Sequence, residues 1–326
     1  MKLLKISILF FFSFNLTGQK TKILNLAGEW KFTIGDREEY VDVDYDDSSW
    51  ESIKVPSPWE NEGFANYNGF AWYRYSFDGK DLKGFTNLLI NLGYIDDVHE
   101  AYLNERLIGF KGSFPPEFYT AYNALNEYAL PESAINRNGE NVIAIKVYDL
   151  VQEGGIAKGN IGIYLDAKLG RDFHSLEGVW RFTTNQDLDW EKRSYDDQDW
   201  ENIIVPSYWR SKHIKRSKGY GWYRKEFKIP EDLKDRDLYL VMGKIDDFDY
   251  TYVNGEIIGR TKDFLPFGES TSYDEFRIYK ISKELLNPRG TNIIAVQVED
   301  IGIDAGIYSG PIGLTANVSS KRNYGR

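Results

Sequence analysis

The sequence has no cysteine, and only three histidines and two methionines among its 326 residues. The absence of cysteine excludes disulfides and thiolate catalysis, so stability must come from a packed core. The formal net charge is -10, and an acidic chain repels phosphate, which excludes a general binder of nucleic acid or anionic lipid. Glycine-rich phosphate loops, zinc-ligand spacings and Gly-x-Ser-x-Gly nucleophile motifs are also absent from the sequence.

Long apolar runs are missing too, apart from residues 6–16, which are too few to span a bilayer as a helix. Lysines precede this run and small residues follow it, an order typical of a secretory signal peptide. We therefore predict a cleaved signal over residues 1–18 and an exported protein, periplasmic or extracellular, with no membrane span. The alternative is that the run forms a buried first strand.

The sequence is rich in apolar and aromatic side chains, with 42% hydrophobic residues, 9 Trp and 23 Tyr. The length suits about two domains with real cores. Aromatic residues in this number fit either large β cores or flat surfaces that stack on ligands.

A shift of 150 residues, rising to 151 after one insertion, superposes the chain on itself. The matched pairs include Leu26/Leu176, Trp30/Trp180, Phe32/Phe182, Trp50/Trp200, Trp59/Trp209, Trp72/Trp222, Arg74/Arg224, Asp96/Asp246, Asp97/Asp247, Asn104/Asn254, Val147/Val298 and Asp149/Asp300. A long period with two copies indicates duplicated globular domains, not a solenoid. We predict a first domain over 19–168 and a second over 169–326.

Within each copy the pattern predicts strand after strand. Apolar and polar residues alternate over 143–147 and again over 294–298, which is the period of a strand with one face on a core. The pair Asn254-Gly255 between two β-rich runs predicts a tight hairpin. Many short strands with Gly and Pro turns indicate an all-β fold of two tandem jelly-roll β-sandwiches.

The motifs Gly-x-Trp-x-Phe, Asp-Asp-x-x-Trp, Val-Pro-Ser-x-Trp, Trp-Tyr-Arg and Tyr-x-Asn, closed by Gly-Ile-x-x-Gly-x-Ile-Gly, occur in this order. Taken together they resemble the N-terminal sugar-binding domain of glycoside hydrolase family 2, found in β-galactosidases and β-glucuronidases. The resemblance covers nearly all of 19–326, twice. It implies a galactose-binding-like jelly roll in each copy. The (β/α)8 barrel that carries catalysis in that family has no counterpart in these residues.

In that family the accessory domain lends loop residues to the sugar site. The loops that correspond here are 60–69, 111–122 and 149–160, and in the second copy 210–219, 261–273 and 300–311. The ligand-binding residues that we predict on these loops are Trp59, Asn66, Tyr67, Asn68, Glu117, Tyr119, Tyr122, Glu153, Trp209, Lys212, Arg216, Tyr220, Asp263, Phe267, Asp304 and Tyr308.

Repeated carboxylates at Asp96-Asp97 and Asp246-Asp247 are the obvious candidates for catalysis. Adjacent residues of a strand point to opposite faces, so neither pair is expected to flank one glycosidic bond. We interpret each pair as the hydrogen-bonded end of a strand. No catalytic residue and no metal ligand is therefore assigned, and no cofactor is expected. A structural calcium ion, common in galactose-binding-like folds, is compatible with the sequence, which does not locate it.

The tryptophans divide into two groups. Trp30, Trp50 and Trp72, with their counterparts Trp180, Trp200 and Trp222, are expected in cores. Trp59 and Trp209 follow Pro-Ser at a loop entrance, and for them an exposed stacking role and a structural role are equally favoured. Arg74 and Arg224 share a strand face with tryptophan and are expected to stack on it or to pair with a buried acid.

The two copies differ most in the loop after Trp59 and Trp209. Residues 60–68 are polar, aromatic and mildly acidic, whereas 210–218 hold five fixed positive charges on an acidic protein. We hypothesise that the second copy meets an anionic glycan and the first a neutral sugar. A solvated loop is the alternative.

The preferred function is non-catalytic carbohydrate binding by an exported protein, in polysaccharide or glycan utilisation. The partner is then an oligo- or polysaccharide, with stacking on loop aromatics and hydrogen bonds from nearby polar groups. Two alternatives stay open: a β-galactosidase-like hydrolase, or an accessory subunit of such a catalytic chain; and a structural or protein-interaction module with no sugar site.

Overall fold

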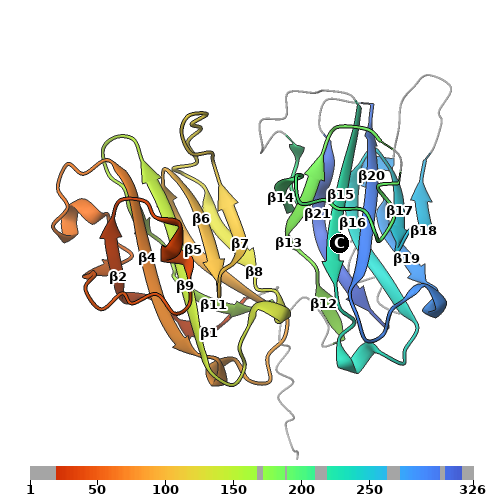
Figure 1. The fold of residues 1–326 in the computed structure, drawn as a ribbon, viewed down its shortest axis with the longest axis horizontal. Helices are drawn as coiled ribbons and strands as arrows, with labels where there is room; N and C mark the ends of the chain where they lie inside the picture. The colour runs from red at the N-terminus through yellow and green to blue at the C-terminus, as the bar shows by residue number, and fades with distance from the viewer. Residues whose placement is uncertain are drawn as a thin grey trace, which may run out of the picture.

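The computed structural model describes residues 20–166, 172–187, 189–209, 219–262, 272–301 and 305–317. These residues form four antiparallel sheets and contain no α-helix, so the prediction of an all-β fold is confirmed. The strands of residues 21–165 make two of the sheets, and those of residues 173–315 make the other two. We call these parts the first and the second module (Figure 1).

The first module has a six-stranded sheet in the order β3-β2-β4-β9-β6-β7 and a sheet in the order β1-β11-β5-β10, with β8 also paired to β5. Its strands are β1 (Thr21–Asn25), β2 (Gly28–Ile34), β3 (Glu51–Val55), β4 (Gly69–Asp78), β5 (Leu88–Asp96), β6 (Val98–Leu103), β7 (Arg106–Lys111), β8 (Leu125–Ala129), β9 (Glu140–Asp149), β10 (Gly155–Lys158) and β11 (Gly162–Leu165). Its 3₁₀ turns are η1 (Glu38–Val41), η2 (Trp59–Glu62), η3 (Gly79–Leu82) and η4 (Glu132–Ala134).

The second module has the same plan, with sheets in the orders β14-β13-β15-β20-β17-β18 and β12-β21-β16-β19. Its strands are β12 (Phe173–Ser175), β13 (Gly178–Thr183), β14 (Glu201–Val205), β15 (Gly219–Phe227), β16 (Leu238–Asp246), β17 (Phe248–Val253), β18 (Glu256–Thr261), β19 (Phe276–Ile281), β20 (Asn292–Asp300) and β21 (Gly306–Thr315). Its 3₁₀ turns are η6 (Glu231–Leu233), η7 (Ser272–Asp274) and η8 (Lys283–Leu285).

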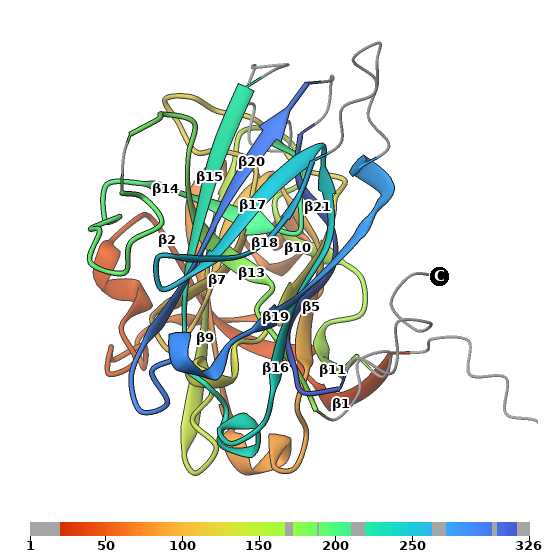
Figure 2. The ribbon, with the colours of Figure 1, turned by 90° about the vertical axis from the view of Figure 1, so that its right-hand side faces the viewer.

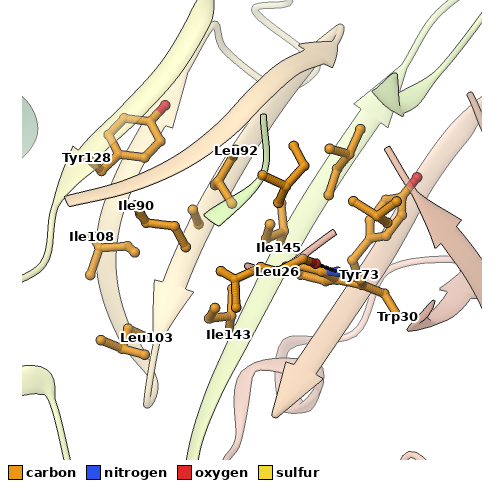
Figure 3. Packing of buried hydrophobic residues seen from close by; sticks show 14 of the residues in the cluster. Leu26, Trp30, Tyr73, Ile90, Leu92, Leu103, Ile108, Tyr128, Ile143 and Ile145 are labelled. Carbon is orange, nitrogen blue, oxygen red and sulfur yellow. Dashed lines mark hydrogen bonds between the residues drawn. The ribbon is translucent and has the colours of Figure 1, made fainter. Parts of the chain in front are cut away.

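The core of each module lies between its two sheets. In the first module, Ile90 and Leu92 of β5 pack against Ile143 and Ile145 of β9, which belong to opposite sheets (Figure 3). Trp30 lies in the same cluster with 1% of its surface exposed, and its Nε1 donates a 2.7 Å hydrogen bond to the Leu26 carbonyl. The indole is thus buried with its polar atom satisfied, as the energetics of aromatic burial demand.

A second cluster covers the outer face of each six-stranded sheet. Trp50 and Trp72 pack there with Tyr40 and Ala144 in the first module. The same arrangement recurs in the second module, in the cluster Trp190, Trp200, Trp222 and Ala295. The strands β9 and β20 are therefore covered on both faces of their sheets. This explains why nearly all of their residues are buried.

A buried arginine ties each outer cluster to its sheet. Arg74 Nε donates to Asp47 Oδ2 at 2.8 Å, and Arg224 Nε donates to Asp197 Oδ2 at 2.7 Å. The remaining guanidinium protons of Arg74 reach the carbonyls of Tyr40 and Asp42. The expected pairing with an acid is confirmed, although Asp47 and Asp197 are half-buried and not buried.

The predicted hairpin at Asn254-Gly255 connects β17 and β18. Both residues have positive φ, 52° and 96°, the left-handed region that Asn and Gly tolerate best. The first module turns at Asn104, with φ of 49°, where the amide of the side chain also bonds Asn141.

The two modules lie side by side in Figure 1, and the view from the second module shows its strands in front of those of the first (Figure 2). They approach through β7 and β13, where a Cβ built on Gly178 lies 3.8 Å from the Ile108 carbonyl oxygen. No helix among the described residues is long and apolar enough to cross a membrane.

Candidate functional site

Three loops of the first module meet at one end of its sandwich. The amide of Gly154 donates to Glu60 Oε2 at 3.1 Å, which links the loops 149–160 and 60–69. Phe114 of the loop 111–122 stacks on Phe70 at the start of β4, with ring centroids 5.6 Å apart. The structure therefore brings together the three segments that the resemblance singled out in this module.

Asp97 holds these loops in place. Its carboxylate accepts hydrogen bonds from the Thr120 hydroxyl and, at 3.1 Å, from the Leu150 amide, while its carbonyl accepts from the Ala121 amide. One residue thus fixes the loop that follows β7 and the loop that follows β9. Asp97 is hydrogen-bonded as expected, but it lies between β5 and β6 in a crossing between sheets and not at the end of a strand before a hairpin.

A group of three carboxylates forms at this end of the core. One oxygen each of Asp96, Asp97 and Asp149 lies within 4.8 Å of the other two. Asp149 ends β9 on the side that Val147 and Ile145 turn to the core, and it has 0% of its surface exposed. Asp96 is half-buried and ends β5 in the opposite sheet. We call these three residues the first acidic cluster.

Burial dominates the electrostatics of this cluster. It raises the pKa of Asp96 to about 7, helped by the carboxylates of Asp97, Asp149 and Glu153. It also raises the pKa of Asp149 to about 7, together with Asp97 and Glu60, against a smaller opposite effect of the Val151 amide. Desolvation and like charge act in the same direction here, because both disfavour the ionised form.

The expectation that Asp96 and Asp97 point apart is wrong. The alternation of side chains holds within one strand, but the chain leaves the sheet of β5 at Asp96 and enters the sheet of β6 at Val98. The two residues occupy the crossing between sheets, where no pleat separates them. Their repeat at Asp246 and Asp247 makes the same crossing from β16 to β17.

The cluster nevertheless does not present two accessible carboxylates to a substrate. Retaining and inverting enzymes hold two carboxyl groups about 5 to 9.5 Å apart across the sugar bond. Here Asp97 is hydrogen-bonded to the loops and Asp149 has no exposed surface, so neither is free to face a substrate. The arrangement suits a bound cation or a shared proton better than a substrate between two acids.

Exposed tyrosines flank this end of the module. Tyr119 has 52% and Tyr122 has 59% of its surface exposed, although neighbouring Phe118 packs on Tyr148 with centroids 5.7 Å apart. Leu150 and Val151, at 46% and 57%, are exposed on the adjoining loop. The remaining predicted residues on these loops, Asn66, Asn68, Glu117 and Glu153, are also exposed, and Tyr67 is half-buried.

Trp59 and Trp209 do not stack on ligands, because both are core residues with 0% and 1% exposure. Trp59 Nε1 donates to the Tyr67 carbonyl at 3.2 Å, and Trp209 Nε1 donates to the Tyr223 hydroxyl at 2.6 Å. Glycines make room for these rings: a Cβ on Gly154 would lie 2.3 Å from Trp59. Pro-Ser before a tryptophan looks the same in sequence whether the ring turns inward or outward.

In the second module the structure describes only part of the predicted set. Tyr220 is half-buried and its hydroxyl donates to Glu299 Oε1 at 3.1 Å. Tyr308 stacks on Tyr208, with ring centroids 4.8 Å apart, and its hydroxyl donates to the Tyr273 carbonyl. The predicted residues Lys212, Arg216, Asp263, Phe267 and Asp304 lie outside the described residues, as does the basic segment 210–218.

The second module repeats the carboxylate group with Asp246, Asp247 and Asp300, which we call the second acidic cluster. A fully buried cation stands beside it: Arg277 Nη2 donates to the Asp247 carbonyl at 2.7 Å. Arg277 also pairs with Asp249, whose carboxylate accepts from Tyr279 and Thr251 as well. This module thus carries a positive charge within its own core.

The first module has neutral residues at the same places. Asn126 corresponds to Arg277, and His99 corresponds to Asp249. His99 Nε2 lies 2.8 Å from the Tyr128 hydroxyl, and burial lowers the pKa of the imidazole to about 3, so the ring is neutral. Asn126 has 1% exposure, and neither polar atom of its amide has a hydrogen-bond partner among the described residues.

Asp149, Asn126 and Arg277 were not predicted as functional residues. An alignment of the two copies could have pointed to Asn126 and Arg277. Position 126 aligns with 277 and position 99 with 249, so an arginine–aspartate pair in one copy is replaced by asparagine and histidine in the other. A coordinated change of charge at two matched positions is typical of side chains that touch.

A cleft also runs between the modules. Its volume is about 260 Å³, and Lys20, Glu127 and Glu177 line it. Lys20 pairs with Glu127, and burial is the main cause that raises the pKa of Glu177 to about 7. The predicted ligand-binding residues do not line this cleft.

The known proteins to which this chain is similar include β-galactosidases and β-glucuronidases. A family model described as the beta-galactosidase second all-beta domain matches residues 187–304. A β-galactosidase of Thermoanaerobacter pseudethanolicus is 27% identical over 136 residues, which cover 40% of this chain and 17% of that protein. A β-glucuronidase of Formosa agariphila is 26% identical over 144 residues, which cover 40% of this chain and 14% of that protein.

Two solved structures align with most of this chain at low identity. A Bacteroides uniformis β-glucuronidase aligns with 89% of this chain and 28% of its own length, at 14% identity and a TM-score of 0.37. A β-glycosidase from Bacteroides vulgatus aligns with 87% of this chain and 29% of its own length, at 17% identity and a TM-score of 0.36. The chain thus spans less than a third of the length of each of these relatives. Residues 187–304 are therefore similar to the second all-β domain of β-galactosidases, and the described residues form antiparallel sheets without a catalytic barrel.

Proposed function

We propose that the protein is an exported, non-catalytic carbohydrate-binding protein that acts in polysaccharide or glycan utilisation, and that its first module binds sugar at the end where the three loops meet. The observation that supports this most directly is the pair of exposed aromatic rings, Tyr119 and Tyr122, on a loop anchored to Asp97. Flat rings on a fixed loop suit the apolar faces of sugars.

Polar groups around these rings supply the second half of a sugar site. Asn66, Asn68, Glu117 and Glu153 are exposed on the three loops. Sugar hydroxyls need donors and acceptors placed beside the stacking surface, and amides with carboxylates offer both. Asp149 is buried and Asp97 accepts a hydrogen bond from the Leu150 amide. These two acids are therefore not placed to cleave a glycosidic bond, which favours a site that binds sugar without hydrolysing it.

For the second module we propose an anionic glycan. The segment 210–218 carries Arg210, Lys212, Lys215, Arg216 and Lys218 in a chain of net charge -10. A local positive loop on an acidic protein attracts uronate or sulfate groups, with an affinity that salt weakens. Two of the curated relatives are named β-glucuronidases, a name that denotes an anionic sugar substrate.

Affinity electrophoresis against neutral and acidic plant and algal polysaccharides tests the proposal. We expect retardation of the protein by at least one of them, and Tyr122→Ala should weaken this binding about tenfold, since one stacked ring contributes about 1–1.5 kcal/mol. Ile257→Ala, which removes another exposed apolar side chain, on β18, is the control and should bind normally.

Three results would contradict parts of the proposal. Absence of retardation on every polysaccharide would refute sugar binding. Hydrolysis of nitrophenyl glycosides by the purified protein would refute its non-catalytic character. Binding to an acidic polysaccharide that neither salt nor Lys212→Gln with Arg216→Gln reduces would refute the role of the basic segment. Terminal sequencing of the secreted protein, expected to begin at Gln19, tests export.

A further inference from the structure

A second cleft lies where the two modules meet, at the contact between β7 and β13 (Figure 1). Its volume is about 440 Å³, a size typical of sites for small molecules. Arg106, Leu107 and Pro131 of the first module line one side of it. Residues of β13, β14 and β15 in the second module line the other side. Neither module forms this cleft alone.

Positive charge predominates in this cleft, although the net charge of the chain is -10. Four cationic side chains and two carboxylates line it. Arg224 pairs with Asp197, so three cations remain beside the one exposed carboxylate of Glu226. The name cationic cleft is used below for the space that these three cations line, namely Arg106, Arg181 and Lys225.

Neutral partners hold each of the three cations. Arg106 Nη1 donates to Ser133 Oγ at 2.6 Å, and Lys225 Nζ donates to the Val179 carbonyl at 2.6 Å. Arg181 Nη1 donates to a backbone carbonyl and to an amide oxygen, both at 3.2 Å. None of the three forms an ion pair in the part of the chain that the structure describes, and Nε and Nη2 of both arginines donate no hydrogen bond there. Both guanidinium groups therefore keep the donors that a carboxylate or a sulfate accepts in pairs.

The electrostatics of the cationic cleft disfavour its own charges. Burial lowers the pKa of Lys225 to about 7, and the charge of Arg106 is the second cause. Burial also lowers the pKa of Arg106, against an opposite effect of Glu226. Desolvation and like charge both destabilise an ammonium group unless a negative charge lies beside it. An anionic ligand in the cleft would supply that negative charge.

The repeat shows that the scaffold itself does not require these cations. Arg106 of β7 corresponds to Glu256 of β18, where the charge is reversed. Lys225 corresponds to Tyr75, whose ring packs on Trp30 with centroids 5.0 Å apart. The same two positions of the sandwich thus carry a negative charge and a neutral ring outside the cationic cleft. The positive charge belongs to the junction between the modules.

We propose that the cationic cleft binds the carboxylate or sulfate group of an acidic sugar between the two modules. Arg106 and Arg181 donate to the anion, Lys225 balances its charge, and Leu107 and Pro131 offer apolar surface to the sugar ring. The choice of a sugar rests on the proposed function, whereas the charge of the ligand rests on the cleft alone. A ligand in this place touches both modules and stabilises the contact between them.

Isothermal calorimetry of the full mature chain at low ionic strength tests the cleft. The probes are glucuronate, glucose 6-sulfate, glucose and inorganic sulfate. At least one of the two acidic sugars should bind at one site per chain with a Kd of about 1 mM, as expected for a ligand of this size in an open cleft. Comparison of the two shows whether the anion is a carboxylate or a sulfate. Glucose and inorganic sulfate should each bind at least tenfold more weakly, because each lacks one half of the ligand.

Two variants remove one charge each from the cationic cleft. Lys225→Tyr introduces the residue that packs on tryptophan in the first module, so a fold that accepts it is already known from the other copy. Arg106→Gln changes an exposed position and serves if Lys225→Tyr does not fold. Each should weaken binding of the acidic sugar at least tenfold. Arg260→Gln, which removes an exposed arginine from β18, is the matched control and should bind as the natural protein does.

The proposal fails if neither acidic sugar binds, or if Lys225→Tyr and Arg106→Gln keep the full affinity. Inorganic sulfate that binds as tightly as the acidic sugars would overturn the assignment of a sugar. Loss of binding in the variant Lys212→Gln with Arg216→Gln would place the site on the basic segment and overturn the cleft.

The outcome is distinguishable from that of the proposed function. Retardation by a polysaccharide that persists in both cleft variants, without binding of either acidic sugar, refutes the cleft and leaves the proposed function standing. Binding of an acidic sugar that the cleft variants abolish, without retardation by any polysaccharide, supports the cleft and refutes polysaccharide binding.

Discussion

The two modules repeat the same strand order, yet they balance one buried position in different ways. Both keep an arginine on the outer face of the six-stranded sheet, where Arg74 and Arg224 pair with Asp47 and Asp197. Inside the core, the second module buries an ion pair of Arg277 with Asp249, whereas the first has Asn126 and His99. One scaffold thus accepts either a charged or a neutral pair, provided that both members change together.

The largest effect is expected when only one residue of the neutral pair of the first module is introduced into the second module. Arg277→Asn leaves Asp249 buried without its cation, so we expect the second module to lose about 3–5 kcal/mol of unfolding free energy. Denaturant unfolding of the full chain measures the loss. Arg277→Asn combined with Asp249→His reproduces the pair of the first module and should recover most of it. A single variant as stable as the natural protein would refute the compensation.

The next largest difference should be the loss of stability of the first module at acidic pH. Burial lowers the pKa of His99 to about 3, whereas the unfolded chain binds a proton near pH 6.5. The contribution of His99 to stability is therefore complete above pH 6.5 and is lost as the pH falls toward 3, by about 1.4 kcal/mol per pH unit. Thermal unfolding of natural protein and His99→Gln between pH 7 and 4 should show a smaller acid loss in the variant. Equal slopes would contradict a neutral, buried His99.

The smallest expected effect is the loss of one turn hydrogen bond, and it should be equal in the two modules. Asp46 Oδ1 accepts from the Ser48 amide at 3.0 Å, and Asp196 Oδ1 accepts from the Gln198 amide at 3.1 Å, in matching turns. Asp46→Ala and Asp196→Ala should each lower the Tm slightly and to the same extent, because a single hydrogen bond in a solvent-exposed turn contributes little net stability. Differential scanning calorimetry compares the two losses. A loss at one site alone would show that the turns are not equivalent.

Much of the fold could be predicted from residues 20–317. Alternation over 143–147 and the turn at Asn254-Gly255 depend on local periodicity and on backbone preference, and both appear in the structure as expected. The pairing of Arg74 with an acid was predictable because a buried guanidinium needs a partner. The burial of Trp59 was not, since loop geometry decides which way its ring turns.

The candidate site shows the same division. The sequence alone predicted the repeat and the polar character of the loop 60–68. Only the tertiary structure brought Asp149 to Asp96 and Asp97, because these residues lie about 50 positions apart on strands of opposite sheets. Strand periodicity is a local property, whereas the meeting of carboxylates at the open end of a core depends on how two sheets pack and where the chain crosses between them.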